Sequence, residues 1–107
     1  MKDKCKILGV EYKIIEDGDI EKLGYDGLAL VYKHEIKIRP YENMLSGEDD
    51  MSDKKSYFRE VLRHECLHAL FAESGSERWE NDEDLVTWIS KMYPKIESLF
   101  AELGCAT

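Results

Sequence analysis

The sequence predicts an α+β fold in which a small antiparallel β-sheet of about three strands packs on two helices. Two observations favour this fold. Short stretches before residue 40 combine β-branched and aromatic residues with the period-two alternation of strands. Residues 54–74 and 82–103 instead repeat apolar residues at the spacing of amphipathic helices. Because 107 residues is close to the usual size of one domain, we expect residues 1–107 to form a single domain.

The strands are expected in the first part of the chain. Residues 6–16 predict one strand with a bend at Gly9. Residues 17–24 are polar and contain glycine, which predicts a turn or a short helix. Residues 28–32 and 35–39 predict a hairpin, because the second stretch alternates isoleucine with basic residues.

The main helix should follow an acidic connector. Residues 41–54 lack the ligand order of a calcium-binding loop, so we expect a solvated segment. The helix is then predicted over residues 54–74, with Ser52 or Asp53 as its N-cap and Gly75 just beyond its end.

A second helix is predicted after a crossing over residues 76–80. Asn81 is expected to cap this helix, and the acids that follow suit the positive end of the helix dipole. Pro94 should kink the helix or split it, and Gly104 should end it.

The main helix contains the motif H-E-x-x-H, formed by His64, Glu65 and His68. A shuffled chain of this composition would contain such a motif about once in a hundred tries, so its surroundings matter. A helical wheel places all three residues within the apolar arc of the helix, where unpaired polar groups are costly. A metal ion bound by both imidazoles explains this placement, with the glutamate beside it to activate water.

A catalytic zinc site usually has three protein ligands, so a third ligand is expected outside the motif. Glu73 lies on the opposite side of the main helix from His64 and is excluded. The second helix can return an acid to the site, and Glu83 is favoured because it shares a face with the apolar Val86. Asp82 and Glu80 remain alternatives.

Two other candidate ligands are better explained without a metal. Cys66 lies two residues from each motif histidine and points away from their face, as expected for a half-buried apolar residue. His34 lies at the predicted hairpin turn, where a histidine is usually solvated.

The cysteines Cys5, Cys66 and Cys105 are odd in number and lack CxxC spacing, which favours a reducing, cytoplasmic location.

The overall charge limits the possible partners. The chain has a formal net charge of −8, which argues against nucleic acid and anionic membranes as partners. It contains no apolar run long enough to span a bilayer and no apolar core of a signal peptide near its start. A peptide or protein substrate is the expected partner, and the oligomeric state stays open.

The motif with its downstream stretch, Asn81-x-Glu83-Asp84-Leu85-Val86, resembles the small zincin-like metallopeptidases encoded by phages and mobile elements, which belong with the gluzincins. The resemblance implies a small antiparallel sheet backed by the active-site helix, with a following helix that brings a glutamate. It also implies His64, His68 and Glu83 as the ligands of one Zn²⁺ ion and Glu65 as the base.

The expected activity is therefore zinc-dependent peptide hydrolysis, with Glu65 taking a proton from the metal-bound water and passing it to the leaving amine. Arg39, Tyr41 or Tyr93 could steady the oxyanion. Residues 35–39 could form the sheet edge to which an extended peptide adds.

Two other interpretations stay open. The first is a catalytically weak or inactive metal-binding module that uses its acidic surface against a host or regulatory protein. The second is a metal-free interaction protein in which His64 and His68 are core residues.

Overall fold

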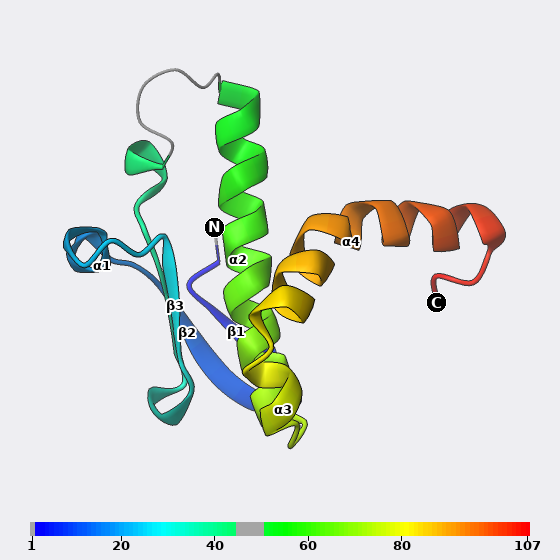
Figure 1. Ribbon diagram of the computed structural model, residues 1–107, viewed down its shortest axis with the longest axis horizontal. Helices are drawn as coiled ribbons and strands as arrows, with labels where there is room; N and C mark the ends of the chain where they lie inside the picture. The colour runs from blue at the N-terminus through cyan, green and yellow to red at the C-terminus, as the bar shows by residue number, and fades with distance from the viewer. Residues whose placement is uncertain (1, 45–50) are drawn as a thin grey trace.

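The computed structural model describes residues 2–44 and 51–107. Within them, four strands form one mixed sheet in the order β1-β2-β4-β3. The strands are β1 (Lys4–Ile7), β2 (Val10–Glu16), β3 (Gly27–Leu30) and β4 (Glu35–Ile38). The helices are α1 (Gly18–Lys22), α2 (Met51–Glu73), α3 (Glu77–Glu80) and α4 (Glu83–Leu103), with 3-10 turns η1 (Val31–Lys33) and η2 (Tyr41–Asn43). The helix α2 lies between the sheet and α4 (Figure 1).

The predicted strand over residues 6–16 is two strands. Leu8 and Gly9 have φ angles of 49° and 86° and form a tight turn, so that β1 and β2 pair as an antiparallel hairpin. Positive φ at both central positions is the signature of the type I′ turn, one of the two-residue turns that suit the twist of a hairpin. The glycine was therefore a turn residue rather than a bend within one strand.

The predicted α+β class is confirmed, but the prediction of an antiparallel sheet of about three strands was wrong in detail, because the described residues form a mixed sheet of four strands. β3 and β4 form the predicted antiparallel hairpin, but β4 also pairs with β2 in parallel. The stretch predicted over residues 35–39 therefore lies inside the sheet and is not its edge. β3 is the edge strand beside α2, and no strand among the described residues pairs with its outer side.

The core lies between the sheet and α2. Ile36 and Ile38 of β4 are fully buried, as their predicted alternation requires. Tyr12 and Ile14 of β2 project to the same core, which Ala69 closes from α2. The sheet and the helix thus fix the face of α2 that carries the motif.

The start of α2 differs from the prediction. Because the helix begins at Met51, Ser52 and Asp53 lie in its first turn, and neither is its N-cap. Part of the predicted solvated connector, residues 45–50, lies outside the described residues. At the other end, α2 stops at Glu73 and Gly75 adopts φ 83°, as expected for a residue that follows a helix.

The predicted N-cap of the second helix was also wrong. Asn81 ends the short helix α3, whereas Asp82 caps α4 by accepting a hydrogen bond from the Leu85 backbone N–H at 3.0 Å. The unpredicted turn of α3 moves the start of α4 by one residue.

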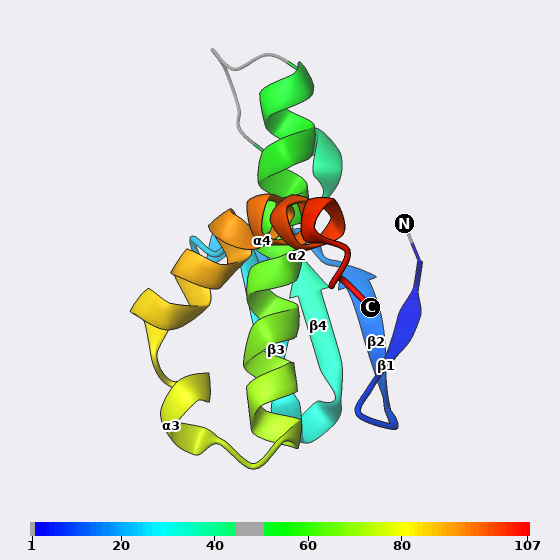
Figure 2. The same ribbon diagram turned by 90° about the vertical axis from the view of Figure 1, so that its right-hand side faces the viewer.

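The helix α4 is continuous through Pro94 and ends at Gly104, where φ is 75°. Figures 1 and 2 show that its first turns run beside α2 and that its C-terminal part points away from the body. The radius of gyration, 14.5 Å, accordingly exceeds the value of about 13 Å usual for this length. No helix in the described part of the chain is long and apolar enough to cross a membrane.

Candidate metal centre

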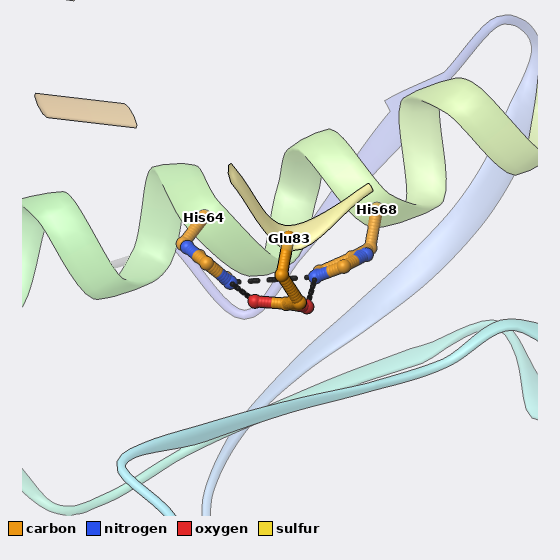
Figure 3. Close-up of side chains that lie close together, drawn as sticks. All are labelled: His64, His68 and Glu83. Atoms are coloured by element: carbon orange, nitrogen blue, oxygen red, sulfur yellow. Dashed lines mark hydrogen bonds and ion pairs between the residues drawn. The ribbon is translucent and has the colours of Figure 1, made fainter. Parts of the chain in front are cut away.

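Three side chains converge beside α2 (Figure 3). The Nε2 atoms of His64 and His68 lie 3.3 Å apart, because four residues make just over one helical turn. Glu83, at the first position of α4, places one carboxylate oxygen 3.1 Å from His64 Nε2 and the other 2.7 Å from His68 Nε2. The three ligand atoms fit within 4.8 Å of one another, so this group could hold a metal ion.

The second nitrogen of His68 fixes the orientation of its ring. Nδ1 lies 2.7 Å from the backbone carbonyl of Glu80 in α3. Because a carbonyl only accepts, Nδ1 carries the proton and Nε2 keeps its lone pair for a metal. Glu80, an alternative third ligand in the sequence, thus serves the site through its backbone rather than its carboxylate.

The donor set suits a divalent metal. In a tetrahedral zinc site, ligands about 2.0–2.2 Å from the ion are separated by roughly 3.4 Å, close to the separations among these three side chains. His64 and His68 are mostly buried, at 21% and 12% side-chain exposure, whereas Glu83 is 66% exposed. Burial, and then the neighbouring His68, lower the pKa of His64 against the opposing pull of Glu83, which favours the neutral imidazole that binds metals.

Asp82 is excluded as a ligand by its own role. Its carboxylate caps α4 through the Leu85 N–H and is absent from the group of convergent ligands found among the described residues. The neighbouring Glu83 instead directs its carboxylate toward His64 and His68. Of the three acids considered from sequence, only this one brings its carboxylate to them.

Glu65 lies against the edge strand β3. Its side chain accepts a hydrogen bond from the backbone N–H of Ala29, and its Cγ would be 2.7 Å from a Cβ at Gly27. Burial raises the pKa of Glu65 to about 7, with Glu83 adding to the rise while His68 and the Ala29 N–H oppose it. A carboxylate with this pKa can accept and release a proton near neutral pH.

The motif lines a cleft between α2 and the start of β3. Two adjoining hollows share Gly27, His64 and Glu65. One also contains Tyr25 and the other Lys91. Sequence reasoning missed three of these residues, Gly27 of β3, Tyr25 before it and Lys91 of α4, because no local pattern shows which strand and which part of α4 lie beside the motif.

The side chains expected to steady an oxyanion lie elsewhere. Arg39 is paired with Asp26 at 3.4 Å. Tyr41 packs edge-on against Phe58, and Tyr93 lines an apolar groove on another side of α2. None of the three lines the cleft in the described part of the structure.

Cys66 and His34 are also outside the cluster, as expected. Cys66 lines the apolar groove with Leu67 and Leu70, and burial raises the pKa of its thiol to about 12. His34 is exposed at the turn before β4, where its ring lies 5.2 Å from that of Tyr12. Neither side chain belongs to the group of ligands that converge in the described residues.

No protein-family model, no curated protein and no solved structure matches this chain. The function must therefore be argued from the site itself.

Proposed function

We propose that the protein is a zinc-dependent metallopeptidase with a minimal zincin-like fold. The observation that carries the proposal is the convergence of His64, His68 and Glu83 beside the partly buried Glu65. The motif and its downstream glutamate resemble those of the gluzincins, and the arrangement of the side chains supports the same ligand set. Zn²⁺ bound there would lower the pKa of a coordinated water and polarise a carbonyl.

Different residues would then bind the metal and transfer the proton. His64, His68 and Glu83 hold the ion, and the Glu80 carbonyl keeps His68 in the required tautomer. Glu65 accepts the proton of the attacking water and delivers it to the leaving amine, a role that its place in the same hollow as the three candidate ligands suits.

The substrate would be an extended peptide. The outer side of β3 has no strand partner among the described residues and borders the cleft. An extended segment can add to such an edge by backbone hydrogen bonds, which would carry its carbonyl past Glu65. This assigns to β3 the role that the sequence had suggested for residues 35–39.

The test is Glu65→Gln assayed on a mixed peptide library with zinc supplied. Loss of a general base should lower kcat at least about a hundredfold, while the zinc content stays at one ion per chain. Glu60→Gln is the matched control, because Glu60 lines the same cleft on the same helix and has no proposed role in proton transfer. Full activity in Glu65→Gln would exclude the mechanism.

A second candidate is a metal-binding interaction module without hydrolytic activity. One observation favours it: Glu65 is hydrogen-bonded to Ala29 on the strand to which a peptide would add. One zinc ion per chain with no cleavage of any peptide by the wild type would select this candidate over the peptidase.

A further inference from the structure

Pro94 leaves a buried carbonyl without its helical partner. In an α-helix the N–H of residue 94 would donate to the carbonyl of Ser90, but proline has no N–H and its ring pushes that carbonyl aside. Ser90 is 1% exposed, so water cannot readily replace the missing donor. The bend of α4 visible in Figure 1 accompanies this break in the hydrogen-bond ladder.

Arg63 supplies the missing donor from the neighbouring helix. Its Nε–H donates to the Ser90 carbonyl at 2.8 Å. No carboxylate among the described residues forms an ion pair with Arg63, so the contact to the backbone is the polar interaction that defines its position. Arg63 directly precedes His64 in the sequence, and the contact therefore ties α4 to the helix that carries both candidate histidine ligands.

The position of Glu83 depends on how α4 is anchored. Glu83 is exposed, and its side chain has little packing of its own to hold it over the histidines. The first two turns of α4 are instead fixed by the fully buried Val86 and by Ser90, seven residues after Glu83. The contact between Arg63 and Ser90 lies at the end of this anchored segment.

We propose that Arg63 is a positioning residue of the metal centre, which holds α4 and its ligand Glu83 through the carbonyl that Pro94 leaves free. The inference rests on the proposed metal site. It adds that tight metal binding needs the contact between Arg63 and Ser90 as well as the three ligands. Partners that orient metal ligands commonly affect metal affinity by about tenfold to a hundredfold.

The test compares Arg63→Met with Arg63→Gln in the full chain. Both changes remove the charge, but the glutamine amide nitrogen is as many bonds from Cα as the arginine Nε and can donate to Ser90. Zn²⁺ affinity should fall about tenfold or more in Arg63→Met and recover in Arg63→Gln. The visible spectrum of bound Co²⁺, which reports coordination geometry, should change in the first variant only. Arg59→Met, at an exposed arginine one turn earlier, should leave both measurements unchanged.

A second pair of variants tests the link to the proline. Pro94→Ala restores an N–H that can donate to Ser90, so adding Arg63→Met to it should weaken Zn²⁺ binding less than about twofold. If Arg63→Met alone does not fold, recovery of the fold and of metal binding in the double variant supports the coupling, and no recovery overturns it.

The outcomes separate the two proposals. A wild-type protein that binds no zinc would exclude the metal centre. A wild type that binds zinc, with Arg63→Met equal to it or with Arg63→Gln as weak as Arg63→Met, would overturn only the role of Arg63.

Discussion

At the scale of single residues, Gly27 shows how closely α2 approaches the sheet. A Cβ at this position would lie 2.7 Å from Cγ of Glu65 and 2.9 Å from Cγ1 of Val61, too close for either atom to stay in place. Gly27→Ala should therefore lower the free energy of unfolding by about 1–3 kcal/mol, the usual cost of overpacking. It should also displace Glu65, so that peptide hydrolysis falls more than zinc binding.

Urea denaturation and a peptidase assay would check this prediction. Gly18→Ala is the control, since a Cβ there meets no atom within 4 Å. Equal stability of the two variants would show that α2 can move away from β3 at little cost.

Tyr57 gives a prediction for alkaline pH. Its hydroxyl donates to Asp26, and burial, followed by this hydrogen bond, raises the pKa of Tyr57 to about 12. The native state thus favours the neutral phenol, and its contribution to stability is complete below pH of about 10 and is lost as the pH rises toward 12. Tyr57→Phe should cost about 1 kcal/mol near neutral pH, and the difference from wild type should shrink over this alkaline range.

The measurement is urea denaturation at pH 8 and pH 11 for the wild type and the variant. Tyr32→Phe, at a fully exposed tyrosine, serves as the control and should show no difference from wild type at pH 8. A constant difference between wild type and Tyr57→Phe at both pH values would contradict the assignment of the shift to this hydroxyl.

The convergence of the three candidate ligands could be predicted because each position follows from local geometry. Helical spacing alone puts His64 and His68 together, and the short crossing limits the third ligand to a few acids. The partners of Glu65 were not predictable in the same way. Gly27 and Ala29 lie beside Glu65 only because β3 is the edge strand. The residue pattern of β3 does not predict that position in the sheet.

At the scale of elements, the start of α4 assigns helix capping and the candidate metal centre to two different acids. Asp82 accepts the Leu85 N–H, and Glu83 turns to the histidines. Asp82→Ala should lower the free energy of unfolding by about 1 kcal/mol while the chain still binds one zinc ion. Asp82→Asn should restore most of the loss, because asparagine caps helices well without a charge.

Zinc content and thermal unfolding of both variants, beside Glu83→Ala, check this assignment. Glu83→Ala should lose most of its zinc with a smaller change in the stability of the metal-free protein. Loss of zinc in Asp82→Asn with retention in Glu83→Ala would reverse the roles of the two acids.

The sheet shows which part of the fold the sequence does not determine locally. The alternation over residues 35–39 predicted that Ile36 and Ile38 share one face, and both are buried. Alternation is the same for a parallel and an antiparallel neighbour, so it could not reveal that β2 and β4 run in parallel. The crossover between them, through α1 and β3, places β3 at the edge beside α2 and so creates one wall of the cleft.

At the scale of the whole molecule, the candidate metal centre joins three helices. Two ligands come from α2, the third from α4, and the carbonyl that orients His68 comes from α3. A metal bound there links segments that otherwise meet through few buried residues, since Val86 and Ser90 are the buried residues of α4. Metal binding should therefore stabilise the folded chain as a unit.

Zinc at a hundred times its dissociation constant should add about 2.7 kcal/mol to the free energy of unfolding. For a domain of this size, that corresponds to a rise in Tm of roughly 10 °C. The rise should vanish with a chelator and be absent in His64→Ala, because two remaining ligands bind zinc weakly. Glu97→Ala removes an exposed acid from the outer part of α4 and should keep the full rise. If neither zinc nor a chelator changes the Tm of the wild type, the protein is metal-free. The two histidines and Glu83 are then held together by their own hydrogen bonds.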